Sequence, residues 1–175
     1  FRSIEDSDKN AMMVLESRAR FQPESVARSG LSQFDGDVFD LGPDYDGRQT
    51  ANNLELIAEL EKRLAVEQHP KVRQDLEILI QSLNDENESR RISKQYMLPY
   101  FNMHGVVFGS FNALLDPRNE KERYAKALER LRKYNGSEEG FTPITELAKA
   151  RTSERFETPG LQGPYVGELE KDLAN

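Results

Sequence analysis

The sequence contains no cysteine and only two histidines among its 175 residues. Without cysteine the chain has neither a disulfide framework nor a thiolate metal site. A zinc-peptidase helix needs two histidines one turn apart and a glutamate base, whereas His69 and His104 lie 35 positions apart and neither precedes a glutamate. The G-x-S-x-G elbow, the P-loop and the dinucleotide fingerprint are also missing from the sequence. We therefore expect no catalytic residues, no cofactor and no metal site in this chain by itself.

Basic residues are in deficit, with 24 Lys and Arg against 31 Asp and Glu and a net charge of −7. The densest basic run, residues 130–133, is interrupted by Leu131. Surfaces that bind nucleic acid normally need a basic patch that follows the phosphates. We therefore expect no nucleic-acid partner.

Long hydrophobic runs are scarce too, and the main one is residues 95–115. Proline, asparagine, histidine and glycine residues interrupt it, and its uninterrupted part, residues 106–115, is shorter than a membrane span. We expect no membrane-spanning segment.

The remaining composition predicts one all-α domain over residues 1–175. Hydrophobic residues make up 37% of the chain and charged residues 31%, and the two kinds are mixed at helical spacing. The predicted fold is an irregular helical bundle built on a long antiparallel helix hairpin, with a broken apolar central helix. Caps, prolines and glycines predict further helices that start at Asp6–Asp8, at Pro23, at Asp116–Pro117 and at Thr142–Pro143.

The hairpin is predicted from two amphipathic stretches, Thr50–Glu67 and Pro70–Lys94. His69–Pro70 ends the first helix and begins the second, because proline suits a first helical turn and disfavours helix at the preceding residue. The short connection favours an antiparallel pair. Leucine and isoleucine at steps of three and four predict its buried face, which comprises Leu54, Ile57, Leu64, Leu76, Leu79 and Leu83.

An acidic stretch, residues 31–47, carries five aspartates among glycine and proline and predicts an ordered loop. Aspartates at such spacing raise the alternative of a calcium site. Counted from Asp35 as an EF-hand loop, however, the fifth position is Phe39 and the sixth is Asp40 where glycine is required. A capped, solvated acidic loop is the favoured interpretation.

The central segment, residues 95–115, is where we expect a ligand-binding surface, if the chain has one. Pro99 removes a backbone donor, so this segment should be a broken helix or a helix–turn–helix. A cleft wall that is aromatic with a few placed polar atoms is typical of small-ligand and peptide sites. The candidates for a substrate cleft are Tyr96, Tyr100, Asn102 and His104. The alternative for His104 is a buried histidine that only hydrogen-bonds the helix break.

Both ends of the chain carry expectations of their own. The chain begins at Phe1 without methionine, so any leader would lie outside it. The last segment places Tyr165, Val166, Leu169 and Leu173 at helical spacing and stops at Asn175 without a cap. We expect the natural chain to continue, and this apolar face, Tyr165–Leu173, to pack on the rest of the same chain or on a second copy.

Several stretches together resemble one bacterial family. These are PESVARSGLSQFDGDVFDLGPD, the acidic helix pair, YMLPYFNMHGVVFGSF and RYAKALERLRKY, in this order within roughly residues 22–173. They are similar to the group known as domain of unknown function 885, whose members are often described as lipoproteins or secreted proteins. None of the resembling stretches carries a catalytic motif.

The resemblance implies a periplasmic or lipid-anchored protein with an anchor upstream of this chain. Family members are mostly helical and longer, and their distal half carries a His-Glu pair followed by Pro-Gly-His that looks like a zinc-peptidase helix. That motif is absent here, so the resemblance implies an N-terminal helical part that shapes a peptide cleft, with zinc in a downstream domain. A free-standing helical binding domain without catalytic activity is the alternative.

Overall fold

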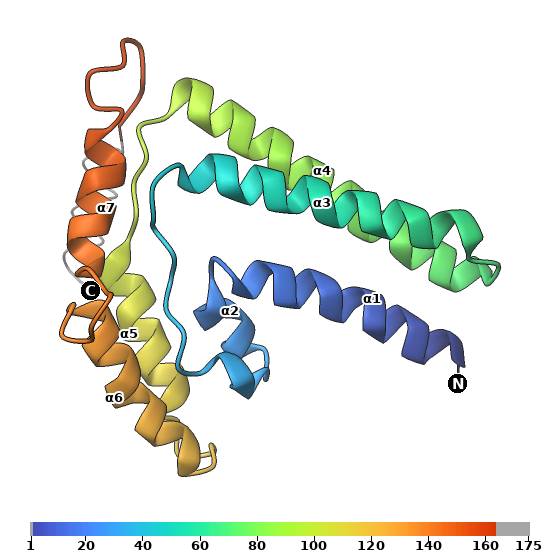
Figure 1. Ribbon diagram of the computed structural model, residues 1–175, viewed down its shortest axis with the longest axis horizontal. Coiled ribbons are helices and arrows are strands. Elements are labelled where there is room, and N and C mark those ends of the chain that lie inside the picture. The colour runs from blue at the N-terminus through green and yellow to red at the C-terminus, as the bar shows by residue number, and fades with distance from the viewer. Residues whose placement is uncertain (1, 164–175) are drawn as a thin grey trace.

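A computed structural model describes residues 2–163 and is all-α, as predicted (Figure 1). Over these residues it contains seven α-helices, one short 3₁₀ helix and no strands, apart from a single bridge between Met97 and Gln162. The elements in chain order are α1 (Arg2–Ala19), α2 (Pro23–Arg28), η1 (Ser32–Phe34), α3 (Tyr45–Val66), α4 (Pro70–Tyr96), α5 (Met103–Leu114), α6 (Glu122–Tyr134) and α7 (Ile144–Ser153).

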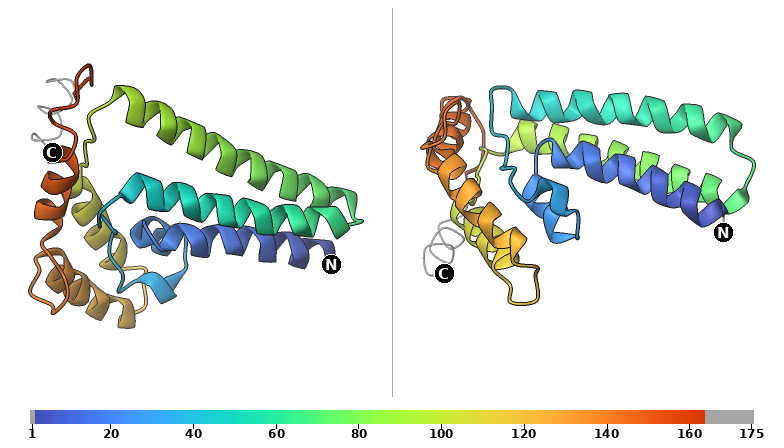
Figure 2. Two further views of the ribbon diagram at one scale, coloured as in Figure 1. Left: turned by 45° about the horizontal axis from the view of Figure 1, so that its top comes forward. Right: turned by 60° about the horizontal axis from the view of Figure 1, so that its bottom comes forward.

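The predicted antiparallel hairpin is confirmed as α3 and α4, and α1 packs along both helices to make a three-helix layer (Figure 2). The core of this layer contains Leu56, Ile57 and Leu60 of α3, together with Leu76 and other apolar residues of α4. Met13 and Val14 of α1 pack against it. Apolar stripes at helical spacing must be buried against one another, and this burial holds the three helices together.

One predicted core residue is wrong. Leu54 is 55% exposed, whereas Ile57, Leu76 and Leu83 are buried as predicted, and Leu64 and Leu79 are half-buried. The position that we assigned to Leu54 is occupied by its polar neighbour Asn53, which is only 7% exposed. Successive helical residues point about 100° apart, so a stripe that includes Asn53 turns Leu54 away from the core.

Three of the predicted helix starts are also wrong. Helix α3 begins at Tyr45, five residues before the predicted Thr50. The first helix begins by Arg2, so the supposed caps lie inside it, and Ser7 Oγ donates to Asp75 of α4 at 2.6 Å. Asp116 begins a turn, since its carboxylate accepts from Arg118 N at 2.9 Å, and α6 starts only at Glu122. The starts of α2 and α7 at Pro23 and just after Pro143 are confirmed.

A second core lies where α5, α6 and α7 pack across one end of the long helices (Figure 1). Tyr45, at the start of α3, is in its centre and makes ring contacts with Phe21, Phe39 and Phe101 at centroid distances of 6.1, 5.6 and 5.9 Å. Aromatic pairs in these arrangements contribute beyond the area they bury. Tyr45 thereby joins the acidic loop and the start of α5 to the three-helix layer.

Basic side chains of α6 hold the acidic loop. Arg123 donates to both carboxylate oxygens of Asp35 at 2.6 and 2.8 Å, and Asp35 is only 2% exposed. Arg130 is fully buried and donates to Phe34 O at 3.0 Å and to Asp37 O at 2.9 Å. These contacts support the predicted ordered loop, but Asp35 is buried in an ion pair and is not solvated as predicted.

The predicted break in the central segment is confirmed. Helix α4 ends at Tyr96, and α5 begins at Met103 after an extended connection. Leu98 N donates to Gln162 O and Gln162 N to Tyr96 O, both at 2.8 Å, so the strand-like connection has backbone partners. Asn102 caps α5, because its Oδ1 accepts from Gly105 N at 2.8 Å.

No helix within residues 2–163 is long and apolar enough to cross a membrane. The predicted contact face Tyr165–Leu173 lies outside the described residues. Its partner, whether the same chain or a second copy, stays a prediction.

Acid is expected to destabilise the fold through two carboxylates whose pKa values are lowered. Two hydrogen bonds from Arg48, at 2.6 and 3.1 Å, lower the pKa of Asp40, and hydrogen bonds from Lys126 and Lys133 lower the pKa of Glu129. A carboxylate with a lowered folded-state pKa stabilises the fold above its unfolded-state pKa of about 4, and this stabilisation is lost as the pH falls through the folded-state value.

The urea midpoint should therefore stay level between about pH 7 and pH 5 and fall below about pH 4. In the double variant Asp40→Asn/Glu129→Gln, the decline should be shallower. Urea unfolding of both proteins over a pH series measures this. A midpoint that rises on acidification would contradict the assignment.

Candidate functional site

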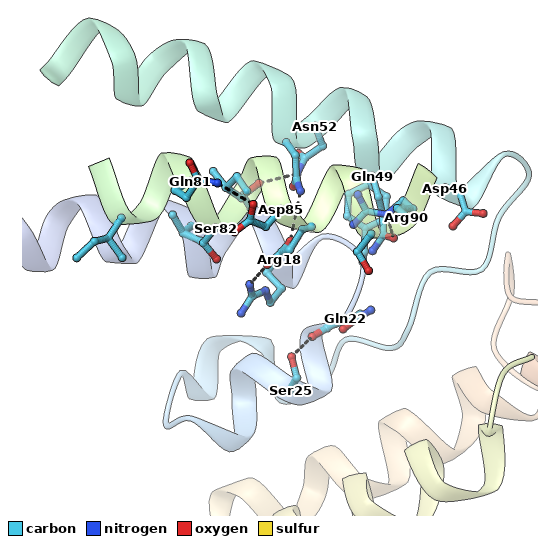
Figure 3. Close-up of a pocket in the computed structure, with 18 of the residues that line it drawn as sticks. Arg18, Gln22, Ser25, Asp46, Gln49, Asn52, Gln81, Ser82, Asp85 and Arg90 are labelled. Atoms are coloured by element: carbon cyan, nitrogen blue, oxygen red, sulfur yellow. Dashed lines mark hydrogen bonds and ion pairs between the residues drawn. The ribbon is translucent and has the colours of Figure 1, made fainter. Parts of the chain in front are cut away.

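A polar groove of about 1240 Å³ opens between α1, α3 and α4 (Figure 3). Its lining contains only four apolar residues, Val14, Phe21, Ile78 and Leu83. The polar lining consists of six carboxamides, five serines, four carboxylates and two arginines. The carboxamides are Gln22, Gln49, Asn52, Asn53, Gln74 and Gln81, the serines Ser17, Ser25, Ser82, Ser89 and Ser93, the carboxylates Asp46, Glu77, Asp85 and Glu86, and the arginines Arg18 and Arg90.

The groove exists because the inner stripes of the helices change from apolar to polar along their length. On α3 the stripe runs backwards from Leu60 and Leu56 to Asn53 and Gln49. On α4 it runs forwards from leucine and valine to Glu86, Arg90 and Ser93. Polar side chains do not close into a dry core, because each must keep a hydrogen-bond partner or water. The apolar stripes therefore pack tightly, and the groove opens where the facing side chains are polar.

One hydrogen-bonded chain joins the three helices across the middle of the groove. Arg18 of α1 forms an ion pair with Glu86 of α4, and Asn53 of α3 donates to the other oxygen of Glu86 at 3.3 Å. Beside it, Asn52 Nδ2 donates to Ser17 Oγ at 2.6 Å. These contacts fix the positions of the groove walls relative to one another.

A second chain closes the end of the groove next to the acidic loop. Arg90 Nε donates to Gln49 Oε1 at 3.1 Å, and Gln49 Nε2 donates to the hydroxyl of Tyr45 at 3.0 Å. Gln22 of the α1–α2 connection also donates to Tyr45 Oη, at 3.1 Å. Burial raises the pKa of Tyr45, so its hydroxyl stays protonated at neutral pH. This end is a hydrogen-bonding wall that carries one cation, Arg90.

A smaller groove of about 730 Å³ lies on the other side of the α3–α4 pair. Asp46 and Arg90 line both grooves, and Leu54 lines the smaller one. Leu54, which we had predicted to be buried, therefore faces the smaller groove instead of the core.

The predicted cleft residues are elsewhere. Tyr96 and Tyr100, which are 53% and 43% exposed, lie at and just after the end of α4, and none of the four candidates lines the large groove. Asn102 is occupied as the cap of α5. The alternative of a buried His104 is wrong, because this side chain is exposed and has no hydrogen bond within residues 2–163. A cleft role for these four residues stays a prediction.

Sequence reasoning missed the groove residues because it tracked apolar positions only. The available signal was the continuation of each stripe into polar residues at the same spacing, as in Asn53 and Gln49 before Leu56 and Leu60. Such positions are polar although their phase on the helix places them inward.

Within residues 2–163, no group of three or more histidine, aspartate or glutamate side chains is placed to hold a metal ion. The arrangement of the groove instead suits reversible hydrogen bonding, since carboxamides both donate and accept and serine hydroxyls do the same. Comparisons of the chain with models of protein families, with curated proteins and with solved structures find no match. The family resemblance described above stays a prediction.

Proposed function

We propose that this chain is a non-catalytic helical module that binds an extended peptide in the groove between α1, α3 and α4. The observation that carries the proposal is the lining of six carboxamides, one from the α1–α2 connection, three from α3 and two from α4. A peptide backbone presents one donor and one acceptor at each residue, and a carboxamide can satisfy both. Binding would need little rearrangement, because the two hydrogen-bonded chains already fix the groove walls.

The length of the groove suits a short extended segment. Its lining on α4 runs from Gln74 to Ser93, which at a rise of about 1.5 Å per residue spans roughly 28 Å. An extended chain rises about 3.3 Å per residue, so roughly eight residues would fill this length. A saccharide is disfavoured, because the only lining aromatic, Phe21, is 7% exposed and offers no open ring face for stacking.

We further propose that the module belongs to a larger secreted or periplasmic zinc-peptidase-like hydrolase, whose substrate it helps to hold. Zinc would reside in a downstream domain. The support for this wider setting is the order of the resembling stretches and the peptide-sized groove. A free-standing binding domain would use the same groove, so peptide binding is the part to test first.

The test is a titration of isotopically labelled protein with a neutral, end-blocked octapeptide of serine, alanine and glycine. We expect saturable shifts of the side-chain amide signals of Gln49, Asn52 and Gln81, and none at Asn112, an exposed carboxamide on α5 outside the groove. Gln81→Leu should weaken binding about three- to tenfold, the value of one lost hydrogen bond of about 0.5–1.5 kcal/mol.

Gln95→Leu is the matched control. Gln81 and Gln95 are both exposed on α4, and each has one hydrogen bond to a residue four positions away, but Gln95 does not line the groove. Equal effects of the two substitutions would contradict the proposal. So would groove shifts produced by an oligosaccharide of similar length in the absence of any peptide response.

A further inference from the structure

The charges that line the groove are unevenly paired. Arg18 is neutralised by its ion pair with Glu86, and Arg90 donates to Gln49 and Asn87. The other three carboxylates, Asp46, Glu77 and Asp85, have no ion pair within residues 2–163. Arg90 donates only to neutral carboxamides, so its charge offsets one of these three carboxylates, and four carboxylates against two arginines leave the groove lining with a net charge of −2.

Two of these carboxylates form a regular row on one wall. Glu77, Gln81 and Asp85 are four residues apart on α4, so they follow one another along the same face. Eight residues of helix place Glu77 and Asp85 about 12 Å apart along the axis. Gln81 lies between them and donates to Asp85 at 2.7 Å (Figure 3).

An extended peptide repeats at nearly the same distance. Residues i and i+4 of an extended chain are about 13 Å apart, and their side chains point to the same side because strand side chains alternate. Residues i and i+3 point to opposite sides. Two basic side chains of the peptide therefore reach both carboxylates at the i, i+4 spacing and not at i, i+3. At the i, i+4 spacing Gln81 faces the peptide backbone between the two basic residues.

We propose that the groove selects basic peptides in which two lysines or arginines are four positions apart. This inference rests on the proposed peptide-binding function and adds the charge and the register of the ligand. Glu77 and Asp85 contact the two basic side chains, and the carboxamides hold the backbone.

The experiment compares four end-blocked octapeptides of otherwise identical serine, alanine and glycine composition on the full chain. They carry lysine at positions 2 and 6, lysine at positions 2 and 5, glutamate at positions 2 and 6, or no charge. At low salt the 2,6-lysine peptide should bind about fivefold more tightly than the neutral one, as two exposed ion pairs allow. The 2,5-lysine peptide should lose most of this gain, and the glutamate peptide should bind most weakly. Salt at about 0.5 M should remove the differences in affinity among the four peptides, because it screens exposed charges.

Substitutions complete the test. Glu77→Gln and Asp85→Asn should each reduce both the preference for the 2,6-lysine peptide over the neutral peptide and its preference over the 2,5-lysine peptide. Glu61→Gln, an exposed carboxylate on α3 outside the groove, makes the same charge change and should alter neither.

The failures are distinguishable. Equal binding of the neutral and 2,6-lysine peptides overturns this inference and leaves the proposed function intact. Equal binding of the two lysine peptides overturns the register, because the attraction is then only diffuse. If none of the four peptides binds, the proposed function fails and this inference fails with it.

Discussion

Replacing Leu60 with alanine is expected to lower the free energy of unfolding by about 2–5 kcal/mol. Leu60 is completely buried in the core shared by α1, α3 and α4, where the surrounding side chains come from three helices and cannot all move in to fill the space. The cost combines the lost transfer free energy of the removed carbons with the cavity that is left. Urea unfolding followed by far-UV circular dichroism measures the change.

Leu54→Ala is the matched control, since it makes the same chemical change on the same helix at a side chain that is 55% exposed. Its effect should stay within about 0.5 kcal/mol, because exposed substitutions away from special features are usually this small. Equal costs at the two positions would refute the orientation of α3, and with it the side of the helix on which the polar groove opens.

The second large effect is expected at Arg130. Its guanidinium, in a residue only 1% exposed, donates to two carbonyl oxygens of the acidic loop and to Ser110 Oγ of α5 at 2.8 Å. Arg130→Met keeps much of the volume but removes these three hydrogen bonds, of which only the one to Ser110 Oγ is fully buried. A hydrogen bond from a charged donor contributes about 1.5–3 kcal/mol, so the variant should lose about 3 kcal/mol or more.

Arg132→Met is the control, because Arg132 lies two residues further along α6 and is exposed. This substitution should leave the free energy of unfolding nearly unchanged. Amide exchange adds a local measurement, because release of the loop should speed exchange at residues 34–41 in Arg130→Met and leave α3 and α4 unchanged. If Arg130→Met were as stable as the parent chain, the desolvation of the cation would fully offset its hydrogen bonds.

Such an outcome would leave Asp35 as the anchor of the loop. Arg123 donates hydrogen bonds to both of its carboxylate oxygens, and this hydrogen bonding raises the pKa of Arg123. The two arginines act at different points of the loop, and Lys133 of α6 adds a third attachment by donating to Gly36 O at 2.7 Å.

Several features of the fold could be predicted from local sequence alone. Helix spacing predicted α3 and α4, Pro70 predicted their junction, and Pro99 predicted the break before α5. Helix α6 ends at Tyr134, and Gly136 follows with a φ of +73°, a conformation that glycine adopts readily. In each case the interactions that decide the structure join residues within a few positions of one another, so a short stretch of sequence is enough to predict the outcome.

The candidate site could not be predicted in this way, and the error at Leu54 shows why. Hydrophobicity favoured Leu54 for the core, yet α1 and α4 approach α3 on the face that carries Asn53. That direction depends on contacts between residues up to 68 positions apart in the sequence, such as Arg18 with Glu86. Tyr96, Tyr100 and His104 drew attention as the aromatic and titratable residues of one segment, while the groove assembles from three.

The sequence by itself therefore determined the long helices, the junction at Pro70, the helix break and the missing catalytic motifs, because these follow from periodicity, backbone sterics and residue type. Only the tertiary structure decided which helix faces meet, how Arg123 and Arg130 hold a loop about 90 positions away, and where a polar groove opens. The physical reason is that pairing between distant residues depends on how whole helices pack, and local periodicity constrains that packing only weakly.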